Sequence, residues 1–102
     1  MKTTDNLEFP VWYDDLAEFE HTHKGYLSGV VLRRSGKIYL LTFYDLARLK
    51  QDAEFEFDQQ GFWSTPNLVL LPSVTRKEIA AVVDKLCEED LDVIFVSSAR
   101  AS

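Results

Sequence analysis

The chain has 102 residues, of which 46% are hydrophobic, and a formal net charge of −6. This composition is typical of a single globular domain over residues 1–102 and excludes a disordered or fibrous chain. The acidic total disfavours nucleic acid as a partner, because a phosphate backbone attracts cations.

Few features of the sequence indicate a cellular compartment. The opening residues, MKTTDNLEF, include one lysine and no apolar run of signal-peptide length. No stretch reaches the roughly 18 apolar residues that cross a bilayer. One cysteine, Cys87, excludes an internal disulfide and favours a reducing compartment. We therefore expect a cytoplasmic protein without a membrane partner.

The first predicted element is a helix from Pro10 to about His23. Pro10 suits the first helical position, and Gly25 is a C-terminal stop. Apolar residues at steps of three and four predict one stripe that covers a face of the next element. That stripe consists of Phe9, Trp12, Tyr13, Leu16 and Phe19.

Two histidines, His21 and His23, fall near the end of this helix. Residues two apart on a helix point about 200° away from each other, so they cannot share a metal ion there. On a strand they would lie on one face. We expect the helical arrangement and no metal site.

The central element is a β-hairpin over residues 26–45 that turns at Ser35-Gly36. A two-residue turn fixes which residues lie opposite each other. Both faces are apolar, so we expect helices or a second copy of the chain to cover both. The expected pairs are Leu32 with Tyr39, Val30 with Leu41, Ser28 with Phe43, Val31 with Leu40, Leu27 with Tyr44 and Arg33 with Ile38.

The tip of the hairpin is basic. Arg33, Arg34 and Lys37 flank the turn and form a candidate site for a phosphate or carboxylate. The glycine pattern of a phosphate-binding loop is missing, so solvated turn residues are the alternative interpretation. A small-molecule or metal-binding domain that uses this tip with His21 and His23 is one alternative function.

Asp45 is predicted to cap a second helix whose apolar stripe is Leu46, Leu49, Ala53 and Phe57. The end of this helix stays open, because residues 54–58 alternate with the period of a strand. If the helix continues, Phe55 is an exposed aromatic residue between carboxylates, which is typical of a contact surface.

Three further elements complete the prediction. Residues 67–71 lie between Pro66 and Pro72 and indicate a strand buried on both faces. Thr75 and Glu78 form a capping box that begins a helix, and residues 93–96 indicate the last strand. The third helix buries Ile79, Val82, Val83 and Leu86.

The order αββαβαβ predicts an α+β fold. Its mixed sheet has about four strands, antiparallel hairpin first, and about three helices accompany it. No stretch forms a catalytic or cofactor signature, so we expect neither an enzyme nor a cofactor.

The charge distribution indicates a basic protein partner, because residues 51–60 carry four carboxylates and no cation. We expect a non-enzymatic acidic protein-binding module, such as a small inhibitor or immunity-type protein that neutralises its partner. A structural homodimer is a further alternative. Trp63 is either a core residue or a hot-spot anchor. The predicted binding surface is Asp52, Glu54, Phe55, Glu56, Asp58 and Trp63.

Overall fold

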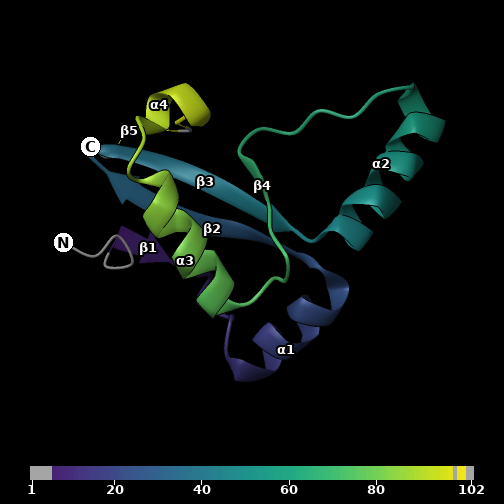
Figure 1. The fold of residues 1–102 in the computed structure, drawn as a ribbon, viewed down its shortest axis with the longest axis horizontal. Coiled ribbons are helices and arrows are strands. Elements are labelled where there is room, and N and C mark those ends of the chain that lie inside the picture. Colours follow the sequence, from purple (N-terminus) through teal and green to yellow (C-terminus); the bar gives the residue numbers. More distant parts are fainter. Residues whose placement is uncertain (1–5, 98, 101–102) are drawn as a thin grey trace.

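The computed structural model describes residues 6–97 and 99–100, and it has the predicted α+β class with a mixed sheet (Figure 1). The described elements begin and end with a two-residue strand. They are β1 (Leu7–Glu8), α1 (Asp15–Lys24), β2 (Tyr26–Arg34), β3 (Lys37–Tyr44), α2 (Leu46–Gln60), β4 (Leu68–Leu70), α3 (Arg76–Leu86), α4 (Leu91–Ile94) and β5 (Ala99–Arg100). β2 and β3 follow each other directly, as do α3 and α4.

The sheet has the strand order β1-β2-β3-β4. The hairpin of β2 and β3 is antiparallel, and β1 adds to it in the antiparallel sense. β4 runs parallel to β3, as expected of a strand reached through a helical crossover. β5 pairs with the start of β3.

The hairpin turn confirms the predicted register near the tip. Ser35 and Gly36 both have positive φ, 54° and 75°, which a tight primed turn requires. The pairing follows the prediction from the tip down to Val30 opposite Leu41.

Beyond that pair the predicted register is wrong by one residue. Gly29, at φ 81°, lies in a bulge between Leu27 and Val30. The bulge inserts an extra residue into β2, and the pairs shift as a result. Leu27 therefore lies opposite Phe43, and Tyr26 lies opposite Tyr44.

The hydrophobic core lies on one side of the sheet, which we call the inner face. α3 crosses this face (Figure 1). Thr75 caps the start of α3, as predicted, because its hydroxyl oxygen accepts a hydrogen bond from Glu78 N at 3.1 Å. The most deeply buried side chains are Leu27, Val30, Leu32, Leu41, Phe43, Val74, Ile79 and Val83.

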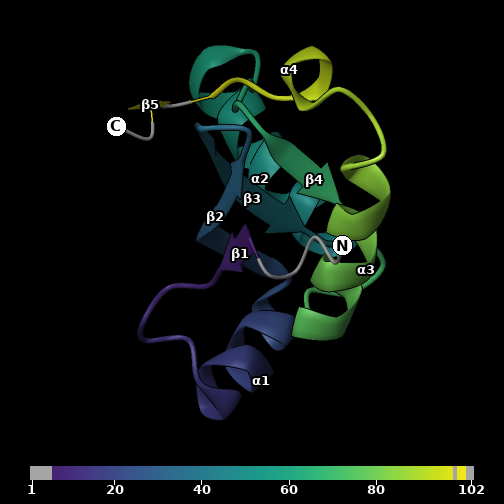
Figure 2. The same cartoon turned by 90° about the vertical axis from the view of Figure 1, so that its left-hand side faces the viewer.

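The opposite side, which we call the outer face, is only partly covered. In Figure 2 α3 and α4 lie on the same side of β2 and β3. On the other side Leu40 is 47% exposed, Leu70 is 48% exposed and Val31 is half-buried. The expectation of full cover on both faces of the hairpin, and of a fully buried strand at residues 67–71, is therefore wrong for the chain alone.

The first helix is shorter than predicted. α1 begins at Asp15, because Asp14 accepts a hydrogen bond from Ala17 N at 2.9 Å and so caps the helix, while Pro10 lies in a turn. The predicted apolar stripe of this helix does not pack against the hairpin along its whole length. Tyr13 and Ala17 are buried, whereas Trp12, Leu16 and Phe19 are exposed.

The end of the chain corrects another prediction. Residues 91–94 form the short helix α4 where a strand over 93–96 was expected. Asp90 caps this helix by accepting a hydrogen bond from Asp92 N at 3.0 Å. Leu91 and Phe95 reach the core from it, while Val96 bonds to the Asn67 side chain rather than to a strand.

Within the described residues, no helix has both the length and the hydropathy that crossing a bilayer requires.

Candidate functional site

The candidate site is α2 and the loop that follows it, which together extend away from the core (Figure 1). Asp45 fixes the start of α2: its Oδ1 accepts from Arg48 N at 2.9 Å, and its backbone N–H donates to Gly25 O at 2.9 Å. The helix therefore begins directly at the end of the hairpin, as predicted.

Polar contacts hold the first two turns of α2 against the sheet. The Tyr44 hydroxyl donates to Asp52 Oδ2 at 2.9 Å, and Arg48 Nε donates to Asp52 Oδ1 at 2.9 Å. The Arg48 guanidinium also lies 5.2 Å from the centre of the Tyr26 ring. Burial, the Asp52 hydrogen bond and the charge of that carboxylate raise the pKa of Tyr44.

Residues 54–58 are helical, which answers the question that the sequence left open. α2 continues to Gln60 and ends at Gly61, whose φ is 84° and whose N–H donates to Phe57 O. Phe55 lies 61% exposed on this helix. The pattern of an exposed aromatic residue between carboxylates is therefore present.

The whole of α2 contains no buried residue. Besides Phe55, Phe57 is 54% exposed and Phe62 is 58% exposed. Phe57 was expected on an apolar stripe with Leu46, and the structure leaves both side chains more than half exposed. Sequence reasoning missed Phe57 and Phe62 as surface residues, because helical spacing shows which residues share a face and not whether anything covers it.

The predicted carboxylates divide into two groups. Asp52 is occupied by Tyr44 and Arg48, and Glu56 accepts a hydrogen bond from Gln60 at 3.1 Å. Glu54 and Asp58 are exposed. We define the α2 tip as the exposed residues Glu54, Phe55, Phe57, Asp58 and Phe62.

Trp63 lies at the base of this site. Its side chain is partly buried, and its ring contacts the Tyr44 ring edge-on with centroids 5.5 Å apart. The residue therefore holds the loop after α2 against the same tyrosine that bonds Asp52.

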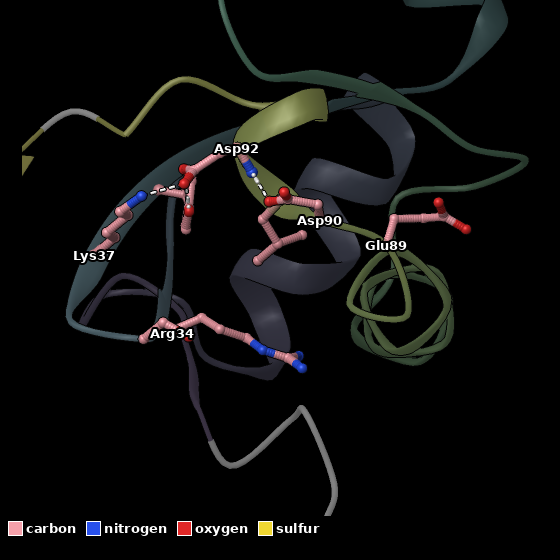
Figure 3. A pocket seen from close by; sticks show the side chains of 8 residues that line it. Arg34, Lys37, Glu89, Asp90 and Asp92 are labelled. Carbon is pink, nitrogen blue, oxygen red and sulfur yellow. Dashed lines mark hydrogen bonds and ion pairs between the residues drawn. The ribbon is translucent and has the colours of Figure 1, made fainter.

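The second candidate region is the basic hairpin tip, where the structure pairs cations with carboxylates. Arg33 Nε lies 2.7 Å from Glu8 Oε2, and Lys37 forms an ion pair with Asp92. Arg34 lines a hollow of about 220 Å³ (Figure 3).

Carboxylates also line that hollow. Glu89, Asp90 and Asp92 lie around the same space as Arg34 (Figure 3). An anion that entered the hollow would meet these charges, which disfavours a phosphate.

Tyr39 completes this region. Its hydroxyl donates to Asp92 Oδ1 at 2.7 Å, and burial, followed by this hydrogen bond, raises the pKa of Tyr39 to about 12. The hydrogen bonds from Lys37 and Tyr39 lower the pKa of Asp92. These contacts fasten α4 to the start of β3.

The two histidines lie in the last turns of α1, as predicted. His21 Nδ1 is 2.7 Å from Tyr26 O, and His23 Nδ1 is 2.9 Å from Phe19 O. Each ring is thus oriented by a different backbone carbonyl. Among the residues that the structure describes, no three His, Cys, Asp or Glu side chains gather as a metal site.

Comparison of the chain with protein-family models, with curated proteins and with solved structures finds no match.

Proposed function

We propose that this chain is a non-enzymatic protein-binding module that docks on a basic partner through the α2 tip. The observation that carries the proposal is the exposure of Phe55, Phe57 and Phe62 on and next to a helix that buries no residue of its own. Large aromatic side chains are enriched in the centre of interfaces, where a partner removes them from water.

The anchoring of α2 supports the same proposal. Its first two turns are held by Asp45, Arg48 and Asp52, whereas the last two turns project away from the sheet (Figure 1). Short helices are marginally stable in water unless a face is packed. A partner groove that receives Phe55 would supply that packing, and Phe57, two residues along the helix, points away from such a groove.

Charge supports a basic partner. Glu54 and Asp58 are exposed on the same helix as the aromatic residues, and no cation occurs between Lys50 and Arg76. Carboxylates around an apolar patch attract a positively charged surface and speed the encounter. Small acidic inhibitor and immunity-type proteins neutralise basic enzymes by this mode, and we propose that class by analogy.

The exposure of Glu54 and Asp58 favours a role in attracting a partner over a role in acid–base catalysis. Acid–base catalysis uses a carboxylate whose pKa is shifted by burial or by neighbouring groups. Glu54 and Asp58 lie on a convex helix in solvent.

The test is capture of a partner from an extract of the source cell with the wild-type chain and two variants as bait. One variant is Glu54→Lys with Asp58→Lys in the α2 tip. The matched control is Glu88→Lys with Glu89→Lys, which makes the same charge change in the exposed turn after α3. For a protein captured by the wild type, we expect association at low salt to slow by about tenfold or more in the first variant only.

Two outcomes would contradict the proposal. In one, no protein is retained by the wild type more strongly than by the α2-tip variant. In the other, both charge variants lose the partner equally, which would show an effect of total charge and not of this surface.

A further inference from the structure

The outer face of the sheet is apolar across three strands. Val31 of β2 pairs with Leu40 of β3. Leu68 and Leu70 of β4 lie beside Thr42 and the buried Tyr44 of β3. Leu40 and Leu70 are each nearly half exposed. None of the α2-tip residues lies on these strands. The outer face is therefore a second, separate apolar surface that a partner could cover.

The charge on this face is locally balanced. Within β1 to β4, the charged residues that share it are Glu8 and Arg33, and their side chains bond each other at 2.7 Å. The chain as a whole carries −6. A basic partner would find no excess of carboxylates here, and the facing patches of two copies add no like-charge repulsion of their own.

We propose that the outer face packs against the outer face of a second copy of the chain, giving a two-fold symmetric dimer. In such a dimer each copy contributes the same patch. Leu40 and Leu70 of one chain are therefore buried against the outer face of the other chain. Sheets stack at about 10 Å with their side chains interdigitated, which suits leucine and valine.

The size of the patch sets the expected strength. Two half-exposed leucines with partly covered neighbours fall below the total of about 1,200 Å² that stable interfaces bury. The dimer is therefore weak and reversible, and it should be populated only at high protein concentration. It goes beyond the proposed function and uses different residues: the first turns of α2 rest on Tyr44 at one end of this face, but the α2 tip includes neither Leu40 nor Leu70.

The experiment is sedimentation velocity of the full chain from about 5 to about 500 µM, a range that brackets a weak dimer. The variants are Leu40→Glu and Leu70→Glu on the outer face. The matched control is Leu16→Glu, an exposed leucine on α1. We expect wild type and Leu16→Glu to shift towards the dimer with concentration, and the outer-face variants to bind at least about 100-fold more weakly, because each dimer would bury two carboxylates.

A milder variant separates loss of the interface from loss of the fold. Leu40→Thr places a β-branched side chain in β3, which suits a strand, so the strand remains favourable. Circular dichroism should show native spectra for all variants, and Leu40→Thr should dimerise less than wild type and more than Leu40→Glu.

Three results would overturn the proposal. The wild type could stay monomeric at every concentration, or a folded Leu40→Glu variant could dimerise as the wild type does. The third is a Leu16→Glu variant whose dimerisation is weakened as much as that of the outer-face variants. The charge variant of the α2 tip should dimerise at least as well as the wild type. Failure of dimerisation thus leaves the proposed partner binding standing, and the reverse also holds.

Discussion

The Tyr44 hydroxyl at the end of β3 donates a hydrogen bond of 2.9 Å to Asp52 Oδ2 in the second turn of α2. This bond joins the sheet to the helix that carries the proposed binding surface. Tyr44→Phe should lower the free energy of unfolding by about 1 to 2 kcal/mol, because the hydroxyl donates to a charged group. Urea denaturation measures this loss, and amide exchange should become faster within residues 51–60.

Tyr26→Phe is the matched control. Tyr26 lies opposite Tyr44, and its ring, which the variant keeps, receives the Arg48 guanidinium. We expect its free energy of unfolding to change by less than about 0.5 kcal/mol. Equal losses in the two variants, or unchanged exchange in α2 after Tyr44→Phe, would show that the bond does not hold the helix.

Two helix-ending glycines offer a paired test of close packing. Gly25 and Gly61 have φ values of 71° and 84°, so alanine is strained at both by about 1 kcal/mol. A Cβ atom on Gly25 would lie 2.4 Å from Asp45 Oδ1, whereas one on Gly61 meets nothing within 4 Å. Gly25→Ala must also displace the cap of α2, which adds about 0.5 to 2 kcal/mol.

Thermal and urea unfolding of the two alanine variants provide the measurement. Gly25→Ala should be the less stable of the pair, and its α2 helix should lose protection from amide exchange. Equal stability of the two variants would mean that Asp45 moves away from Gly25 without loss of its capping role.

The sequence predicted the hairpin well near its turn and poorly at its base. Ser35-Gly36 specifies a two-residue turn, and that turn determines the pairing from Arg34 to Val30. Gly29 marks where the register changes, since an isolated glycine in a strand often lies in a bulge. Periodicity alone does not show how many residues a bulge inserts.

Both ends of the chain were misjudged because local caps outweigh apolar patterns. Asp14 begins α1 four residues after Pro10, and Asp90 begins α4 within an apolar run that also suits a strand. Short apolar runs do not distinguish a strand from a helix. A capping aspartate before each run was the signal that could have indicated the correct elements.

The candidate site was predicted in part. A helix through residues 54–58 places Phe55 on the surface, and this arrangement was one of the two that the sequence left open. The exposure of Phe57 and of Leu40 could not be predicted, because an apolar stripe has the same spacing whether its cover comes from the same chain or from another.

Exposed and buried phenylalanines should respond oppositely in stability and in binding. Phe55→Ala should change the free energy of unfolding by less than about 0.5 kcal/mol, because its ring is largely in solvent. Phe43 lies in the core, so Phe43→Ala should lower the free energy of unfolding by about 3 to 5 kcal/mol. Denaturation of both variants measures the contrast, and Phe55→Ala should dissociate faster from a captured partner. A large loss of stability in Phe55→Ala would show that this ring packs within its own chain.

The contact between Tyr39 and Asp92 predicts how stability changes at alkaline pH. The pKa of Tyr39 rises to about 12 from 10.0, chiefly through burial and then through its hydrogen bond to Asp92. The unfolded chain therefore loses this proton at lower pH than the folded chain does. The stability that the neutral hydroxyl contributes is complete below pH 10.0 and is lost as the pH rises towards about 12.

Tyr39→Phe removes this ionisation and keeps the ring against Phe95. Urea denaturation at pH values from 8 to about 12 should show the wild type losing stability faster than the variant above pH 10.0. The ultraviolet absorbance of ionised tyrosine should rise earlier in unfolded protein than in folded protein. Parallel stability curves for wild type and variant would show that Tyr39 ionises equally in both states, and that its contact with Asp92 does not hold the proton.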